Sequence, residues 1–238
     1  MAIDAVQSPV SLPRFFAPEG AALVRDAVVA LSEEELRHAR VRRLKEGARV
    51  VLLDGRGGSA EGVLRSGAVH LEEVRADVGE PPHHITLLLS CAEPVRLEWA
   101  VEKGTECGAS RFLLVVAARS QLTHVKAVEA RLDRFRRITR EAVKQCGRSR
   151  VPDVEGPFPL GEGILVVEAP LLFASPSAPL PAEPVGNCSI VIGPEGGFAP
   201  DEEALLEAAG ATPFGLGPRT LRLETAAVTA LALLLRGR

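Results

Sequence analysis

Two glycine- and proline-rich segments near the C-terminal end constrain this chain more than any other feature. Each follows an apolar run: the letters IVIGPEGGF occupy residues 190–198, and LGPRTLRLETA occupies residues 216–226. Glycine permits close backbone approach because it has no Cβ, and proline fixes φ. A single Gly-Pro turn is ordinary in an α/β protein. Two such loops, close in sequence, predict one ligand pocket built largely from main-chain N–H and C=O groups.

The region after residue 83 alternates apolar, strand-like runs with helical patterns. Strands are expected at 85–91, 112–116, 164–168, 189–193 and 213–216, and helices at 97–107, about 126–146, and 224–235. Nearly continuous apolar strands that alternate with helices predict an α/β domain with a mainly parallel sheet covered on both faces. Ligands of such sheets bind beyond the carboxyl ends of the strands, where both glycine loops are expected.

The region before residue 79 predicts a smaller, β-rich domain. Strands are expected at 49–54, 60–64 and 68–74, with a hairpin turn at 55–58 and a helix opened by a capping box at Ser32–Glu35. The Gly/Pro-rich residues 79–82 indicate a linker. The expected division is therefore 1–78, linker 79–82, and 83–238. The proline-rich stretch 175–184 is expected to be a surface loop without chemistry.

Charge is distributed unevenly along the chain. Residues 83–150 carry a net charge of +6 and residues 151–238 a net charge of −7, with the basic excess concentrated in 119–150. The helix expected there is apolar on one side and rich in arginine on the other. An acidic protein with one basic band predicts a polyanion docked on one face. A solvated, arginine-rich helix face is the alternative.

Several other kinds of site are absent from the sequence. It has no G-x-x-x-x-G-K-[ST], G-x-G-x-x-G, H-E-x-x-H or G-x-S-x-G, and its four cysteines form no C-x-x-C. We therefore expect no metal site and free thiols. The longest apolar run, 226–235, is too short to span a bilayer, and no segment reads as a secretory signal. These features predict a cytoplasmic protein with no membrane segment.

The two C-terminal motifs resemble the signature of the SPOUT (α/β-knot) methyltransferases. They resemble more closely the family that methylates N3 of a uridine in small-subunit ribosomal RNA. The likeness covers nearly the whole chain, and the segments that share it are 14–16, 38–47, 54–57, 102–108 and 145–152. Leu223 departs from the family's usual threonine, and Ala118 from a position that is often acidic.

This resemblance implies a fold, a cofactor and partners. The fold would be a parallel sheet with a C-terminal trefoil knot, preceded by a PUA-like β-barrel. The cofactor would be S-adenosyl-L-methionine, and the reaction would be methylation of N3 of a uridine in 16S ribosomal RNA near the decoding region. The partners would be that RNA, free or in the assembled 30S subunit, and a second copy of the chain in a homodimer.

The resemblance and the loop chemistry together nominate site residues. The expected cofactor-binding residues are Ile192, Gly193, Pro194, Glu195, Gly196, Leu216, Gly217, Leu221, Leu223, Thr225 and Ala226. The expected RNA-binding residues are Arg14, Arg43, Arg119, Arg131, Arg134, Arg137 and Arg148.

For catalysis, the imino nitrogen of uracil is nearly non-nucleophilic while protonated. Methyl transfer therefore needs that proton removed or the developing anion stabilised, for which a guanidinium is suited. Arg222 and Glu224 are the expected catalytic residues, and Arg219 lies in the same loop. Arg222 pairing structurally with Glu224, and Glu224 stabilising the N-terminus of the last helix, remain open alternatives.

Three further alternatives remain open at this point. The last helix is apolar almost all round, so either a dimer interface or the core of one subunit has to bury it. The chain could be another knotted methyltransferase that acts on tRNA or at a 2′-OH. It could also be a non-enzymatic RNA-binding protein, although such a protein has no use for two ligand loops.

Overall fold

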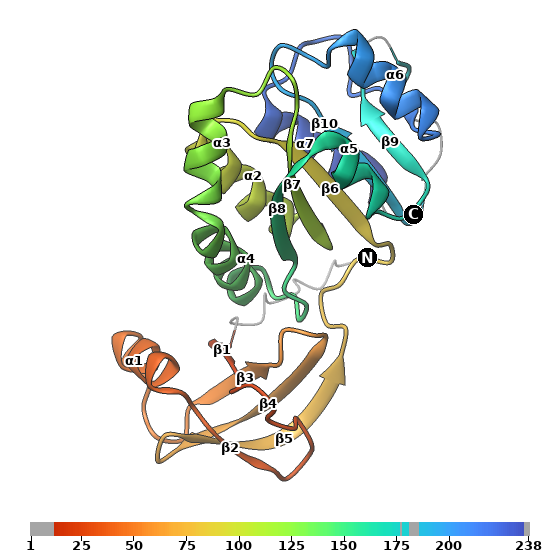
Figure 1. The fold of residues 1–238 in the computed structure, drawn as a ribbon. Coiled ribbons are helices and arrows are strands. Elements are labelled where there is room, and N and C mark those ends of the chain that lie inside the picture. The colour runs from red at the N-terminus through yellow and green to blue at the C-terminus, as the bar shows by residue number, and fades with distance from the viewer. Residues whose placement is uncertain (1–11, 177, 181–185, 236–238) are drawn as a thin grey trace, which may run out of the picture. The chain divides into compact units, whose positions relative to one another are not determined.

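The computed structural model describes residues 12–176, 178–180 and 186–235 (Figure 1). Its contacts divide the chain into two units. The first contains the residues up to Gly79 together with Gly147–Arg150, and the second contains Glu80–Cys146 and the residues from Val151 onward. The expected division assigned Gly147–Arg150 to the second domain. Their contacts lie in the first, where Arg150 Nη2 lies 2.6 Å from the Asp77 carboxylate.

The first unit is a five-stranded mixed sheet with one helix. The strand order is β1 (Arg14–Phe16), β3 (Arg49–Leu53), β4 (Gly58–Arg65), β5 (Ala68–Ala76) and β2 (Val28–Ala30). β1 and β3 are parallel, and the other pairs are antiparallel. The helix α1 (Glu33–Val41) begins where the capping box predicts, because Ser32 Oγ accepts a hydrogen bond from the Glu35 N–H at 3.3 Å.

The second unit contains a six-stranded sheet in which every pair is parallel, which confirms the predicted α/β class. Its order is β11 (Thr212–Phe214), β9 (Leu171–Ala174), β10 (Cys188–Ile192), β6 (Ile85–Ser90), β7 (Arg111–Val116) and β8 (Asp153–Pro159). The central strands are apolar on both sides. Leu87 and Leu89 point into one buried cluster and Leu88 into another, so both faces of the sheet must be covered.

Helices cover both faces of this sheet, as Figure 1 shows. The first cluster packs beneath α2 (Pro94–Glu106), α3 (Leu122–Glu129), α4 (Leu132–Cys146) and α7 (Leu223–Leu234). The second packs beneath α5 (Leu160–Leu165) and α6 (Pro200–Ala208). This arrangement leaves the carboxyl ends of the strands to the connecting loops.

Two sequence-based expectations for secondary structure are wrong. The single helix expected at about 126–146 is two helices, because the Arg131 N–H bonds to the Val128 carbonyl in a tight i−3 turn that ends α3 before α4 begins. The strand expected at 164–168 is instead the end of α5 and a loop, and Leu165, the last residue of α5, is 81% exposed. A short apolar run does not distinguish strand from helix by periodicity.

The last helix, α7, is buried mostly within its own subunit. Leu231 and Leu234 are 0% and 1% exposed and belong to the same core cluster as α2 and β6. Leu233 and Leu235 are partly buried against that cluster. Of the two alternatives for burying the last helix, the structure supports the core of one subunit for Leu231 and Leu234.

Candidate functional site

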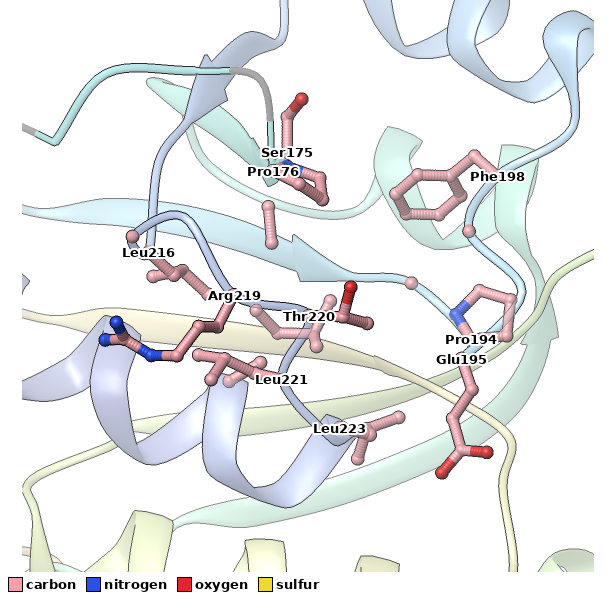
Figure 2. Close-up of a pocket in the computed structure, with 16 residues that line it drawn as sticks. Ser175, Pro176, Pro194, Glu195, Phe198, Leu216, Arg219, Thr220, Leu221 and Leu223 are labelled. Carbon is pink, nitrogen blue, oxygen red and sulfur yellow. The ribbon is translucent and has the colours of Figure 1, made fainter.

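A pocket lies at the carboxyl ends of three neighbouring strands, β11, β9 and β10 (Figure 2). Because these strands are parallel and adjacent, the loops that leave them meet at one edge of the sheet. The lining residues are Ala174, Ser175, Pro176, Ile192, Gly193, Pro194, Glu195, Gly197, Phe198, Leu216, Gly217, Arg219, Thr220, Leu221, Leu223 and Ala226. The two glycine loops thus meet in one pocket, as the sequence predicts.

The loop after β10 forms one wall and is shaped by a tight turn. The Gly197 N–H donates to the Pro194 carbonyl at 2.8 Å. The turn brings the ring of Phe198, which is 7% exposed, back over Gly193 and edge-on to Phe173 at 6.3 Å between ring centroids. A Cβ at Gly193 would lie 2.9 Å from Phe198 Cζ. Glycine is therefore required here by the packing of a ring that lines the pocket.

The loop after β11 forms the second wall and leads into α7. Figure 2 shows Leu216, Thr220, Leu221 and Leu223 following one another along this segment. The Arg219 guanidinium stays near the same loop, with its Nη2 3.9 Å from the place that a Cβ of Gly217 would take. Gly217 has φ +103°, a conformation that L-residues rarely adopt. Apolar side chains from this loop and β10 give the pocket a largely non-polar interior.

The third wall comes from the start of the proline-rich segment, where the sequence predicts no chemistry. Ser175 and Pro176 line the pocket, which the sequence did not predict; residue 177 and residues 181–184 lie outside the described part. Gly215 donates its N–H to the Pro179 carbonyl at 3.1 Å, and Ala178 and Pro179 leave no space for a side chain at Gly215.

The trefoil knot stays a prediction.

Most of the expected cofactor-binding residues line this pocket. Gly196 and Thr225 are the exceptions: Gly196 lies on the exposed turn, and Thr225 is exposed on α7. Sequence reasoning missed Gly197, Phe198, Arg219 and Thr220, which lie inside the two motifs, and three residues at the end of β9 and just after it, Ala174, Ser175 and Pro176. No motif marks the end of β9, so only the sheet order could have found those three. The binding role of all of them stays a prediction.

The two expected catalytic residues differ in placement from Arg219. Arg222 is the N-cap residue of α7, is exposed, and does not line the pocket, whereas Arg219 does. Glu224 lies in the first turn of α7, where a carboxylate interacts favourably with the helix dipole. Its Oε2 is buried and has no hydrogen-bond partner among the described residues.

Two arginines from other elements hold the loop after β10 from outside. Arg96, on α2, forms an ion pair with Glu195, and Arg119, in the turn after β7, donates to the Gly196 carbonyl. Arg119 was expected to bind RNA. The structure brings it to the exposed side of the loop whose inner side lines the pocket.

Two of the expected RNA-binding arginines share one carboxylate. The Arg134 guanidinium makes two hydrogen bonds to Glu98, at 2.6 and 2.7 Å, and Arg131 Nη1 lies 3.6 Å from the same carboxylate. The hydrogen bond from Arg134 lowers the pKa of Glu98, because it stabilises the ionised carboxylate. The positive charge that α4 offers to a polyanion is reduced accordingly.

The other RNA-binding candidates differ in exposure. Arg43, on the loop after α1, and Arg137, on α4, are exposed, and Arg14 is half-buried in β1. Arg148 is 3% exposed, so its guanidinium is not available to RNA in this structure. Arg148 belongs to the segment that clusters with the first unit, and its role in RNA binding stays a prediction.

The described residues contain no group of three or more His, Cys, Asp or Glu side chains that could hold a metal ion. All four cysteines are unpaired, and burial raises the pKa of Cys91 to about 12 and that of Cys188 to about 11. Within the same described ranges, no helix is long and apolar enough to cross a bilayer.

A parallel sheet with a pocket of main-chain loops at its carboxyl edge defines a ligand-binding α/β domain, here joined to a small mixed-sheet unit. The chain belongs to the RNA methyltransferase family: residues 79–235 match the model of an RNA methyltransferase domain. Residues 31–72 match that of an RNA methyltransferase PUA domain, which confirms the expected character of the first unit.

Similar proteins extend over nearly the whole chain. A Mycobacterium tuberculosis protein named ribosomal RNA small subunit methyltransferase E is 35% identical, with 86% of this chain and 85% of the relative covered. The Bacillus subtilis protein of the same name is 32% identical, with 85% of this chain and 88% of the relative covered. The Neisseria gonorrhoeae enzyme of that name was solved bound to S-adenosyl methionine. Its TM-score to this structure is 0.80 at 27% sequence identity, with 93% of this chain and 95% of that chain covered. The SPOUT resemblance is thereby confirmed.

Proposed function

We propose that this protein transfers a methyl group from S-adenosyl-L-methionine to N3 of a uridine in small-subunit ribosomal RNA. The observation that carries the proposal is the pocket at the carboxyl ends of β9, β10 and β11, within a chain whose relatives bear the name of a small-subunit ribosomal RNA methyltransferase. Such an enzyme meets its substrate in the cytoplasm. The proposal includes free 16S RNA or the assembled 30S subunit as the substrate.

The pocket's chemistry fits this cofactor. Ile192, Leu216, Leu221, Leu223 and Ala226 provide apolar surface for an adenine ring, and the loop peptides provide donors and acceptors for its edge. S-adenosylmethionine has no phosphate, which agrees with the absence of a P-loop. When bound, the cofactor supplies an electrophilic methyl group on a sulfonium centre.

The chain's own residues must then assist removal of the N3 proton of uracil or stabilise the anion that develops. The Arg219 guanidinium, at the pocket lining, is placed to stabilise negative charge that develops on the uracil ring as N3 loses its proton. Glu224 and Arg222 lie outside the lining, so we assign the electrostatic role to Arg219 first. Alignment of the uracil nitrogen with the methyl group supplies a large part of the rate.

The RNA would dock on cations that no carboxylate neutralises. Around the end of α1 lies a cluster of exposed cations without an ion pair to any described residue: Arg37, Arg40, Arg42, Arg43 and Lys45. We call it the α1 cluster. In the second unit, Arg137 and Arg119 likewise have no ion pair to a carboxylate of the described residues, whereas Arg131 and Arg134 share Glu98. A surface of this kind fits the phosphate backbone of RNA.

The proposed enzyme is a homodimer. Support for this comes from α2 rather than from Leu231 and Leu234. Val95 and Trp99 are 64% and 44% exposed, and a spacing of four residues places them on one helix face. Large apolar side chains that remain exposed together are suited to an interface with a second copy of the chain.

The proposed function is tested with purified protein, isotopically labelled S-adenosylmethionine, and either 16S RNA or 30S subunits. The expected result is one labelled N3-methyluridine, identified by mass spectrometry of the digested RNA. Label on tRNA, or on a ribose 2′-oxygen, would assign the pocket to a different reaction. RNA binding without any transfer would make the chain a binding protein only.

A further inference from the structure

The side chain of Glu202 links two loops that are far apart in the sequence. Its Oε1 accepts a hydrogen bond from the Ala118 N–H at 2.7 Å, and its Oε2 accepts one from the Ala199 N–H at 2.9 Å. Ala199 is the N-cap residue of α6 and ends the loop that leaves β10, whereas Ala118 belongs to the turn after β7. Glu202 as a whole is only 8% exposed, and each carboxylate oxygen accepts one of these two bonds.

A buried carboxylate with two backbone partners has more than a capping role. Accepting the Ala199 N–H is what a glutamate at the third position of a helix commonly does. The second bond reaches a residue 84 positions away and does nothing for α6 itself. Both bonds are part-buried, so loss of either would release a backbone donor that the carboxylate now holds in place. The geometry therefore ties the turn after β7 to the pocket loop.

The turn that Glu202 holds is itself well ordered by local bonds. The Ser120 N–H donates to the Ala117 carbonyl at 2.9 Å, and Ser120 Oγ accepts from the Ala117 N–H at 3.2 Å. Arg119 lies between Ala118 and Ser120, at the exposed tip. Its side chain crosses to the pocket loop, where its guanidinium donates to the Gly196 carbonyl.

Arg119 keeps its full positive charge in this position. Its partner is a neutral carbonyl, and no carboxylate among the described residues lies within ion-pair distance of it. Arg96, the other arginine on this loop, is instead paired with both Glu93 and Glu195. The pocket loops belong to a region with a net charge of −7. An uncompensated guanidinium there counteracts repulsion between that region and RNA.

We propose that Glu202 is a positioning residue for methyl transfer. By holding the Ala117–Ser120 turn against the pocket loop, it keeps the Arg119 guanidinium beside the pocket, where Arg119 meets the RNA. This inference rests on the proposed function, and it assigns Glu202 no contact with cofactor or substrate.

A double-mutant cycle tests this assignment. Glu202→Gln retains one acceptor oxygen and puts an amide donor against the other N–H, which loosens the turn. We expect kcat/KM for RNA to fall on the order of 10–100-fold, the usual size of a positioning defect. In an Arg119→Ala background, Glu202→Gln should change it less than about 2-fold, because both changes remove the same function. Glu203→Gln, on the exposed side of α6, is the charge-matched control.

A second variant separates positioning from the stability of α6. Ser120→Ala loosens the same turn without touching α6, so it should reproduce the loss and the lack of additivity with Arg119→Ala. Equal fold-losses from Glu202→Gln in both backgrounds would overturn the inference and leave Glu202 a structural cap. So would a normal rate for Arg119→Ala. A wild-type protein that transfers no methyl group would instead refute the proposed function.

Discussion

The α carbon of Gly193 faces the ring of Phe198 so closely that a Cβ there would lie 2.9 Å from Cζ and 3.0 Å from Cε2. The ring is buried against Phe173 and cannot easily retreat. Gly193→Ala should therefore displace the loop and weaken S-adenosylmethionine binding by more than about 10-fold, and Gly193→Val should abolish it. Calorimetry on each variant measures this. Gly161→Ala is the control, because a Cβ there meets only Leu205 at 3.6 Å. Normal affinity in Gly193→Val would remove this loop from the binding site.

Gly217 should be intolerant of substitution for a different reason. A Cβ at this position meets only the tip of Arg219 at 3.9 Å, so crowding, which we expect at Gly193, does not apply. The reason at Gly217 is instead its backbone conformation, whose φ is +103°. In the cofactor-free Gly217→Ala protein the loop should relax to another conformation, so the melting temperature should change little. Returning the loop to the φ seen here should then cost about 1–3 kcal/mol and weaken cofactor binding to a similar extent. Unchanged calorimetric affinity would mean that the loop adopts another conformation at no cost.

The salt dependence of RNA binding should distinguish free arginines from paired ones. Arg43→Ala, in the α1 cluster, should reduce the slope of log affinity against log salt by roughly 0.7–0.9, the value for one lost phosphate contact. Arg134→Ala should reduce it less, because Glu98 already takes up part of that charge. Fluorescence titrations with a small-subunit RNA fragment at several salt concentrations measure both. A larger effect for Arg134 would return the main RNA contact to α4.

The apolar face of α2 should mediate dimerisation. Trp99→Glu should convert a dimer into a folded monomer in light scattering and reduce methyl transfer, because Trp99 is 44% exposed in one subunit. Leu165→Glu is the matched control, since Leu165 is 81% exposed on the opposite face of the sheet. Leu231→Glu should instead unfold the chain, because it buries a charge in the core. A Trp99→Glu protein that stays dimeric at low concentration would contradict the proposal.

In the second unit, the sequence predicts the elements that have long apolar runs. In the first unit, it predicts the elements that are bounded by a glycine-rich turn or a capping box. The apolar strands β6, β7 and β10 and the two glycine loops are visible directly. The pocket wall from Ser175 and Pro176 is not, because it depends on β9 lying between β10 and β11, which is a property of sheet order.

Ion pairs between helices also could not be predicted from the sequence. Nothing near Arg131 or Arg134 in the sequence identifies Glu98 as their partner, because α2 and α4 meet only in the folded chain. The same holds for Glu202 and Ala118. Burial of Leu231 and Leu234 within one subunit likewise depends on α7 packing against α2 and β6, which the composition of α7 alone does not determine.

The central claim is that this chain methylates one base of small-subunit ribosomal RNA. Mass spectrometry of that RNA from a strain that lacks the gene tests it most directly. Our account predicts the loss of a single N3-methyluridine, restored by the wild-type gene and not by a Gly193→Val variant. An unchanged N3-methyluridine content, or the loss of a different modified nucleotide, would contradict it.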